Sequence, residues 1–482
     1  MSKLNNLEPQ KVFYYFEEIS NIPHGSGNTK EISDYLVKFA NDRGLFVSRD
    51  SLNNIIIKKD ATPGYENAVP IIIQGHTDMV CEKENDCNID FEKDPLDLYV
   101  DGDYLRARGT TLGGDDGIAV AYALAILDSD DIAHPKLEVV LTVDEEVGML
   151  GAFDMDLSSL EGKKMLNIDS DLEGHFLTSC AGGMCVIADI PVKRVSQSGT
   201  KLELKVTGLQ GGHSGGEIHQ ERGNASILMG RLLNLLLKNV PYGIETLQGG
   251  LKDNAIPREC VSTILVPTEA KEAVCQIVAE FDSVMKQEFA ISDSQVSVLV
   301  KDLGEDTLEI LDYASVNRIV FYLHTIPNGV QHMSKIMDGL VETSLNLGIM
   351  ELKKDALHTT TSIRSSVSSR KEDLCDKCIQ IIEMVGGEAT VEGAYPAWEY
   401  KNNSPLRDEI AKAYHNLYGK EPIFEAIHAG LECGIFSEKI EGLDCVSFGP
   451  NNLDIHTPME RLSISSTKRV WEFLIEFLKN AR

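Results

Sequence analysis

Several short motifs in this chain place acidic residues or histidine directly after a run of apolar residues. In VPIIIQGHTDMV, His76 and Asp78 stand two residues apart at the end of an isoleucine-rich segment. Side chains at positions i and i+2 of an extended segment point the same way, so this imidazole and this carboxylate are aimed at one place. Acidic residues also follow the apolar runs LEVVLTV (Asp144, Glu145 and Glu146) and KMLNI (Asp169 and Asp171), and the run CVSFGP leads into NNLDIHTPME, which carries His456.

A glycine-rich turn, TTLGGDDG, adds Asp115 and Asp116 just before a long apolar stretch. Carboxylates packed together repel one another, and some would have to stay protonated unless a cation neutralised them. Imidazole nitrogens and carboxylate oxygens are good zinc ligands. Two cations that share a bridging carboxylate suit hydrolysis, because together they hold the nucleophile and the developing oxyanion. The motifs therefore predict a two-metal hydrolytic site, with His76 as a ligand and Asp78 as the carboxylate that orients it.

Each motif has a simpler explanation when it is taken alone. An HxD sequence after a strand can be incidental, and an acid pair such as Glu145–Glu146 is usually surface charge. The pair Asp115–Asp116 could instead cap the following helix. Their common position, each after a strand or a tight turn, favours the metal site. The CxxC sequence at 375–378 has no second pair, and its amphipathic context predicts a helix whose cysteines pack in the core.

The elements that must position these motifs are apolar strands alternating with helical stretches over about residues 30–180. This alternation indicates an α/β domain with a mostly parallel sheet and helices on both faces, which binds ligands beyond the carboxyl ends of its strands. Over residues 187–390 the strands have one solvated face, and a strand–helix–strand–strand order occurs twice, which suggests a doubled unit. We therefore expect a catalytic domain formed by residues 1–186 and 391–482, interrupted by a large α+β lid domain.

Length and composition argue for a multidomain protein and against nucleic-acid or membrane partners. A chain of 482 residues is too long for one compact core. The formal net charge of −30 argues against a nucleic-acid partner, since a phosphate backbone would be repelled; the acidic excess is most simply explained by solubility. No run approaches the ~18 apolar residues of a membrane span, and the N-terminus does not read as a signal peptide. The sequence thus predicts a cytoplasmic protein without a membrane partner, whose ten cysteines are reduced.

The motifs GHTDMV, TTLGGDDGIAVA, TVDEEVGMLGA, NIDSDLEG and DIHTPMERL together resemble the two-metal zinc peptidase superfamily that contains aminoacylase, carboxypeptidase G and carnosinase. Further segments, among them GLQGGHSGGEIHQERGNA, NAIPRE, SIRSSV, AIHAGLECGIF and SFGPNNLDIHTP, resemble the bacterial aminoacyl-histidine dipeptidases (Xaa-His dipeptidases of the cytosolic non-specific type). The resemblance spans nearly the whole chain. It implies a hydrolase that cleaves short unblocked dipeptides, Xaa-His among them, with two zinc ions for which manganese or cobalt can substitute.

The resemblance also implies roles for individual residues. The implied ligands are Asp115 as the bridge, His76 and Asp169 for one ion, and Glu146 and His456 for the other. Glu145 would be the general base, which takes a proton from the metal-bridging water and later gives it to the leaving amine. The family usually has Asn after the bridging Asp, and we expect the extra carboxylate of Asp116 to cap the helix.

Three residues of the inserted domain are implied to bind substrate. His213 in GGHSGG would help to stabilise the oxyanion, although such a histidine can also simply support a turn. Arg364 in SIRSS would bind the C-terminal carboxylate of the substrate through its guanidinium, the alternative being an arginine on a strand surface. Asn254 and the backbone of HAGLECG (428–434) are further pocket groups. Smaller-lid relatives borrow the oxyanion histidine from a dimer partner, whereas a doubled lid could supply it within one chain, so a homodimer is left open.

Two other functions fit part of the same sequence. A tripeptide aminopeptidase or an N-acyl amino-acid deacylase would use the same metal site, and substrate length would separate them from a dipeptidase. An inactive binding scaffold would have lost ligands or the base, and no such loss is visible.

Overall fold

The computed structural model describes residues 3–482, and the chain divides into two compact units. Unit 1 contains the chain up to Cys180 together with Tyr400–Ala426 and Leu431–Arg482, and unit 2 contains Ala181–Glu399 and Ile427–Gly430. The sequence placed the domain boundaries at 186/187 and 390/391. Unit 2 is longer at both ends because its strands β9 (Gly182–Pro191) and β19 (Glu388–Tyr395) run across those positions.

The main sheet of unit 1 is parallel at its centre and antiparallel toward its edges, in the order β1-β2-β6-β3-β7-β21-β8-β20. The parallel strands are β3 (Ile71–His76), β6 (Leu137–Thr142), β7 (Lys164–Asn167) and β21 (Asp444–Ser447). The outer strands are β1 (Phe46–Arg49), β2 (Ile55–Lys59), β8 (His175–Cys180) and β20 (Ile423–Ile427). Every residue of β3 and β6 is buried, which explains their high content of Ile, Val and Leu.

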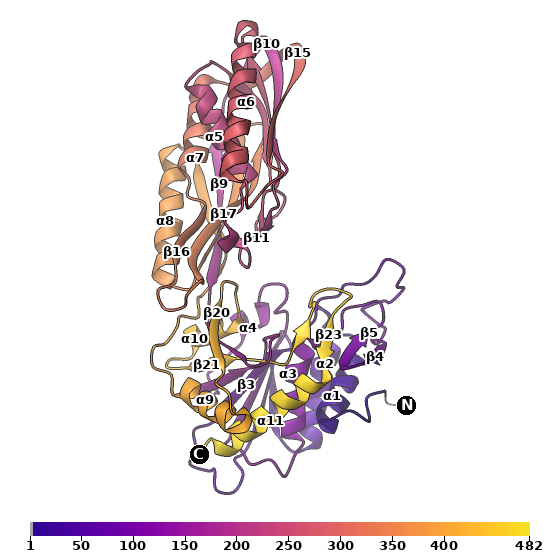
Figure 1. The fold of residues 1–482 in the computed structure, drawn as a ribbon. Helices are drawn as coiled ribbons and strands as arrows, with labels where there is room; N and C mark the ends of the chain where they lie inside the picture. Colours follow the sequence, from indigo (N-terminus) through magenta and orange to yellow (C-terminus); the bar gives the residue numbers. More distant parts are fainter. Residues whose placement is uncertain (1–2) are drawn as a thin grey trace. The chain divides into compact units, whose positions relative to one another are not determined.

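Helices cover both faces of this sheet (Figure 1). Ile71 and Ile73 share a core with α1 (Gln10–Ser20), α2 (Lys30–Asp42), α3 (Gly114–Leu127), α9 (Pro405–Tyr418) and α11 (Ile464–Asn480). Gln74 points to the opposite face, where its side chain contacts Glu432 at the start of α10 (Glu432–Lys439), next to α4 (Leu150–Asp154). The mixed α/β fold predicted from the sequence is thus confirmed, with parallel pairing confined to the centre of the sheet.

A small sheet, β22-β23-β5-β4, holds the late segment that carries His456. Its strands are β22 (Asn452–Leu453), β23 (Arg461–Ser463), β5 (Tyr104–Ala107) and β4 (Leu98–Asp101). His456 lies in the loop between β22 and β23, with a positive φ of 61°. Because β23 pairs with β5, this loop from the end of the chain is tied to the segment that leads into α3.

Unit 2 is built on an antiparallel sheet of order β15-β10-β14-β12-β17-β18-β9-β19, with β16 paired to β17. The other strands of this sheet are β10 (Arg194–Thr207), β12 (Gly243–Gly249), β14 (Cys260–Val266), β15 (Ser297–Leu311), β16 (Gly329–Met333), β17 (Val341–Leu352) and β18 (Ala356–Ser365). A separate two-stranded sheet is formed by β11 (Gly212–His213) and β13 (Ala255–Ile256). One face carries the helices α5 (Ala225–Leu237), α6 (Lys271–Glu288), α7 (Tyr313–Thr325) and α8 (Ser368–Met384) (Figure 1). If the short strands β11, β13 and β16 are set aside, the order strand–helix–strand–strand occurs twice, as β10, α5, β12, β14 and as β15, α7, β17, β18.

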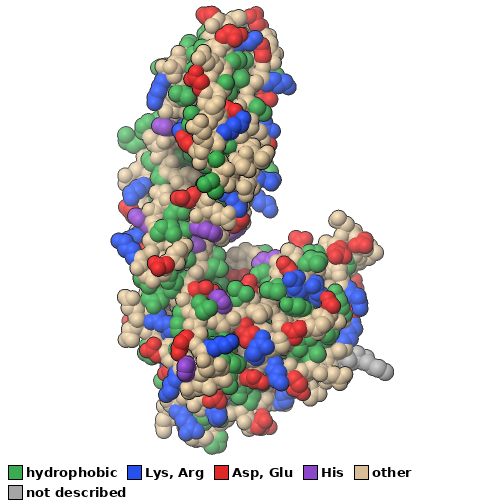
Figure 2. Space-filling view, viewed as in Figure 1, with side chains coloured by type: hydrophobic (Ala, Val, Ile, Leu, Met, Phe, Trp, Pro, Cys, Tyr) green, Lys and Arg blue, Asp and Glu red, His purple; other side chains and the backbone are tan. Residues whose placement is uncertain are grey.

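Cys375 and Cys378 both lie buried in the core between α8 and the sheet, as the CxxC spacing on a helix predicts. The ten cysteines all fall within residues 3–482 and are free thiols. On the face seen in Figure 2, Asp and Glu side chains are interspersed with Lys and Arg. None of the helices formed by residues 3–482 combines the length and apolar character that a membrane crossing needs.

Candidate metal centre

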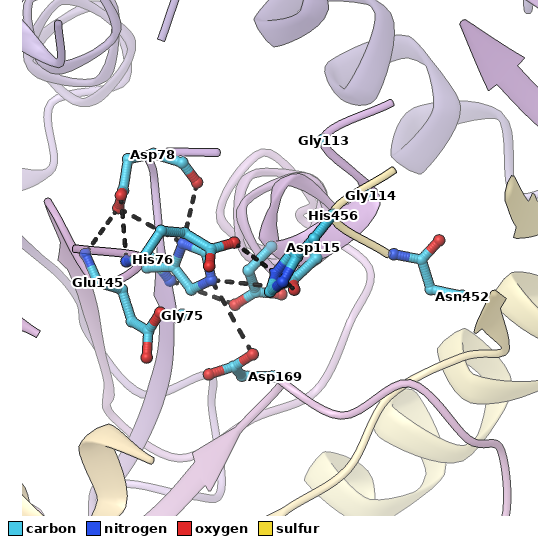
Figure 3. A network of polar contacts seen from close by, with 12 residues as sticks. Gly75, His76, Asp78, Gly113, Gly114, Asp115, Glu145, Asp169, Asn452 and His456 are labelled. Atoms are coloured by element: carbon cyan, nitrogen blue, oxygen red, sulfur yellow. Dashed lines mark hydrogen bonds and ion pairs between the residues drawn. The ribbon is translucent and has the colours of Figure 1, made fainter. Parts of the chain in front are cut away.

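The acidic and histidine motifs of unit 1 meet beyond the carboxyl ends of the parallel strands. His76 is the last residue of β3, and Asp169 follows the end of β7 by two residues. Figure 3 shows the carboxylate of Asp115 between His76 and His456, with Asp169 turned toward them. Nε2 of His76 lies 3.1 Å from Oδ1 of Asp115, and Nε2 of His456 lies 3.1 Å from Oδ2. Each oxygen of Asp115 therefore faces a different imidazole.

Two further carboxylates complete the cluster. Oδ1 of Asp169 lies 4.0 Å from Nε2 of His76, and Oε1 of Glu146 lies 3.0 Å from Nε2 of His456. Oε1 of Glu146 is buried, and apart from this approach to His456 it has no hydrogen-bond partner within residues 3–482. Within residues 3–482, three overlapping groups could hold a metal ion, each with ligand atoms within 4.8 Å of one another: His76, Asp116 and Asp169; His76, Glu145 and Glu146; and Asp115, Glu146 and His456.

The pKa values of several side chains in this cluster are shifted far from their usual ranges. Burial and the neighbouring acids raise the pKa of Asp169 well above its usual range. Hydrogen bonds with Asp115 and Glu146 raise the pKa of His456 to about 10. Burial alone would lower the pKa of His76, but its hydrogen bonds to Asp115 and Asp78 raise it. Crowded carboxylates thus draw protons onto themselves and onto the imidazoles. A divalent cation that replaced those protons would relieve the same repulsion, so the donor set fits metal ions.

Glu145 lies beside the cluster and is a good candidate for proton transfer. Burial, and then the charges of Glu432, Glu146 and Asp115, raise the pKa of Glu145 to about 8, against the opposing effect of His76. A carboxylate of this kind can take up and release a proton close to neutral pH.

Asp78 holds two parts of the site in place at once. Its carboxylate accepts hydrogen bonds from the backbone N–H of Glu145 (3.0 Å) and from the hydroxyl of Ser26 (2.7 Å). Nδ1 of His76 lies 2.9 Å from the main-chain oxygen of Asp78 and 3.5 Å from its Oδ1. The main-chain oxygen is the nearer partner of the imidazole, while the carboxylate mainly fixes the backbone after β6.

The expectation that Asp116 caps the helix is wrong. The N-cap of α3 is Gly113, and Asp116 makes no capping hydrogen bond there. The chain is not helical at Asp115 and Asp116, so the Asp116 side chain turns to the sheet, where Oδ2 accepts the backbone N–H of His76 (3.2 Å). A Cβ on Gly75 would lie 2.5 Å from that oxygen, so glycine is needed for this approach.

Glu460, and not Asp116, binds the backbone N–H groups at the start of the helix. Its buried carboxylate accepts the backbone N–H groups of Leu112 (2.7 Å) and Gly114 (2.8 Å), and also those of Gly113 and Asp115. Asn452 donates to the same carboxylate at 3.1 Å. Sequence reasoning missed this residue although it stands in DIHTPMERL; the available signal was an acid within a motif already linked to the site.

A second carboxylate that sequence reasoning missed is Glu432, the first residue of α10. It is fully buried, and its Oε2 accepts hydrogen bonds from the Thr142 hydroxyl (2.7 Å) and from the Gln74 amide. Burial raises the pKa of Glu432 to about 7. The only sequence signal was an acid within the largely apolar segment AGLECGIF.

The three predicted substrate-binding residues all lie in unit 2. His213 (β11) pairs with Ala255, next to Asn254, whose main-chain oxygen accepts the N–H of Ser214 at 2.8 Å. Nδ1 of His213 accepts the backbone N–H groups of Gly215 and Gly216, which leaves the proton on Nε2 as a donor. Burial and then the charge of Arg364 lower the pKa of His213.

Arg364 (β18) donates from Nη1 to the hydroxyl of Tyr395 at 2.9 Å. The side chain of Asn254 is exposed. The structure therefore brings His213 near both Asn254 and Arg364 within one unit.

Comparisons with known proteins agree with this architecture. Residues 72–480 match the model of peptidase family M20/M25/M40. The chain is 37% identical over 481 residues to the cytosol non-specific dipeptidase of Escherichia coli (strain K12), covering 99% of each chain. Its structure is similar to that of aminoacylhistidine dipeptidase from Vibrio alginolyticus, with a TM-score of 0.94, 35% identity, and coverage of 100% of this chain and 98% of that chain.

A more distant likeness, with a TM-score of 0.61 and 15% identity over 98% of both chains, is to an aminopeptidase from Bacillus cereus and concerns the fold alone. The full-length relationships and the family match, together with the convergence of the predicted ligands, establish that the chain belongs to peptidase family M20/M25/M40.

Proposed function

We propose that this chain is a dipeptidase that hydrolyses short unblocked dipeptides with two divalent metal ions, and that these ions are zinc. The observation that carries the proposal is the carboxylate of Asp115, whose two oxygens each lie 3.1 Å from a different imidazole. A single carboxylate between two separate donor groups is the arrangement that a pair of ions requires. Manganese and cobalt are the alternatives to zinc, since the nitrogen and oxygen donors suit all three.

The ligands divide into two sets. His76 and Asp169 would hold one ion, Glu146 and His456 would hold the other, and Asp115 would contribute one oxygen to each. The buried Oε1 of Glu146, whose one close nitrogen neighbour within residues 3–482 is Nε2 of His456, supports this assignment. When bound, the ions would polarise the scissile carbonyl and lower the pKa of the attacking water.

Glu145 is the proton carrier in this proposal. Its carboxylate accepts the proton of the attacking water and then delivers it to the leaving amine, which restores the ionised base. The raised pKa of Glu145 favours this exchange near neutral pH. Asp78 keeps the Glu145 backbone in place through the 3.0 Å hydrogen bond to its N–H.

The substrate class rests on the relatives named above, a non-specific dipeptidase and an aminoacylhistidine dipeptidase. We propose that Xaa-His dipeptides are among the substrates, that Arg364 binds the C-terminal carboxylate, and that His213 donates to the oxyanion, with Asn254 as a further pocket group. Unit 2 would then be the lid domain. Cytoplasmic location and dimerisation remain predictions.

A peptide panel tests the proposal. The zinc-loaded protein is incubated with β-Ala-His, Gly-His, Ala-Leu, a tripeptide and an N-acetyl amino acid, and the released amino acids are quantified. We expect cleavage of the dipeptides, with the histidyl ones among the best. Preference for the tripeptide would indicate an aminopeptidase, and preference for the acetylated compound would indicate a deacylase. Either result would overturn the substrate assignment but not the metal site.

A further inference from the structure

A row of side chains crosses the face of the unit 2 sheet that lies opposite its helices. Ser344 on β17 stands directly opposite Arg364 on β18, and Arg364 stands opposite Gly183 on β9. Gly183 in turn pairs with Tyr395 on β19. Opposite residues of antiparallel strands point to the same side, about 4.5–5.5 Å apart at Cβ. A Cβ on Gly183 would lie 2.5 Å from the Tyr395 ring, so this glycine lets the ring reach Arg364.

His428 extends this row at the Ser344 end. Its Nε2 lies 2.7 Å from the Ser344 hydroxyl, and the residue is only 6% exposed. The segment that carries it is bound to the start of β9, because the N–H of Ala181 donates to the main-chain oxygens of Ile427 and Ala429. Gly215 lies between His428 and His213: a Cβ there would be 2.8 Å from the His428 oxygen and 3.0 Å from Cε1 of His213.

Two buried nitrogen atoms in this row lack a partner. Nδ1 of His428 and Nε of Arg364 are both buried, and neither has a hydrogen-bond partner within residues 3–482. A buried polar atom without a partner costs free energy, so each of these two nitrogens is a candidate to bind a ligand or an ordered water. Burial and the nearby charge of Arg364 lower the pKa of His428 to about 3, which keeps its imidazole neutral.

We propose that His428 is a specificity residue that binds the C-terminal carboxylate of the dipeptide alongside Arg364, by donating a hydrogen bond from Nδ1. The inference rests on the proposed dipeptidase function and adds to it the side chain of His428, in a segment that the sequence analysis named only for its backbone. In this arrangement the Ser344 hydroxyl donates to Nε2, and the imidazole carries its proton on Nδ1. Arg364 supplies the positive charge that selects an anion, and His428 supplies a neutral donor of fixed direction.

The test compares binding of Ala-Leu and of its C-terminal amide to the zinc-loaded protein by calorimetry. All variants carry Glu145→Gln, so that the peptides bind without turnover. His428→Gln keeps a polar group at the position of Nε2, where it can still meet Ser344, and removes the donor at Nδ1. His428→Asn does the reverse, and is the matched control.

We expect His428→Gln to weaken binding of the free acid about tenfold to a hundredfold, the range for a lost hydrogen bond to a charged group, and to leave the amide within about twofold. His428→Asn retains most of the preference for the acid. Equal losses for acid and amide, or no loss, would show a structural role and overturn the inference. Binding of neither peptide to the Glu145→Gln parent would refute the inference and the proposed function together. An acid preference in the Glu145→Gln parent, combined with no cleavage of any dipeptide by the zinc-loaded protein that retains Glu145, would refute the function alone.

Discussion

Replacing Glu432 by Gln should change how the stability of the protein depends on pH. Glu432 is fully buried, and its hydrogen bonds come from the side chains of Thr142 and Gln74. Both groups can donate equally well to the amide oxygen of a glutamine. Burial raises the pKa of Glu432 from 4.5 to about 7. The substitution therefore removes an ionisation while it keeps the shape and the hydrogen bonds of the protonated acid.

The magnitude follows from that shift. Because the folded state binds the proton more tightly than the unfolded state, this proton contributes stability that is complete below about pH 4.5 and is lost as the pH rises to about 7. A shift of roughly 2.5 pH units corresponds to about 3 kcal/mol, at ~1.36 kcal/mol for each unit. Between pH 4.5 and pH 8, we expect the free energy of unfolding of the wild type to fall by about 3 kcal/mol relative to Glu432→Gln.

The assay is urea unfolding at several pH values with a chelator present throughout, so that no metal ion contributes. Both proteins carry Trp398→Phe, which leaves Trp471 in α11 as the sole tryptophan and makes its fluorescence report on unit 1. Glu438→Gln, an exposed position on the same helix, is the matched control and should reproduce the wild-type pH dependence. If the difference between wild type and Glu432→Gln stays constant from pH 4.5 to 8, the assigned cost of ionising Glu432 is refuted.

Three further outcomes test the metal centre. Glu145→Gln should lower kcat for a dipeptide by about 10²- to 10⁴-fold with an unchanged metal content by elemental analysis, and near-normal turnover would exclude the role of base. Asp115→Asn should retain fewer ions per chain than the wild type after desalting, because the bridging negative charge is lost; full metal retention would contradict the bridge. Adding zinc to the chelated protein should raise its unfolding free energy by about 2.7 kcal/mol once free zinc exceeds its Kd a hundredfold, and an unchanged melting curve would argue against a specific site.

The sequence alone was sufficient for the local elements and for the chemical nature of the site. The isoleucines before His76 and the apolar run after Asp116 specify a buried strand and a buried helix. An uninterrupted apolar run indicates burial on all sides, and this can be read without knowing which elements pack against it. Parallel strands end at one edge of a sheet, so polar residues placed after several such strands must converge there. This is why the order of residues along the chain was enough to group the carboxylates with the imidazoles.

Only the tertiary structure determined which carboxylate accepts hydrogen bonds from which donor. Glu460 binds the turn at Gly114, 346 positions earlier in the chain, and Glu432 binds Thr142 across 290 positions. Neither contact has a periodic signature, because each depends on how separate elements pack rather than on the spacing within one of them. Asp116 shows the same limit: its acidity and its place before a helix predict a cap, but the non-helical backbone at that point turns its carboxylate to His76. The sequence determined which side chains were available for the site, and only packing determined the direction in which each one points.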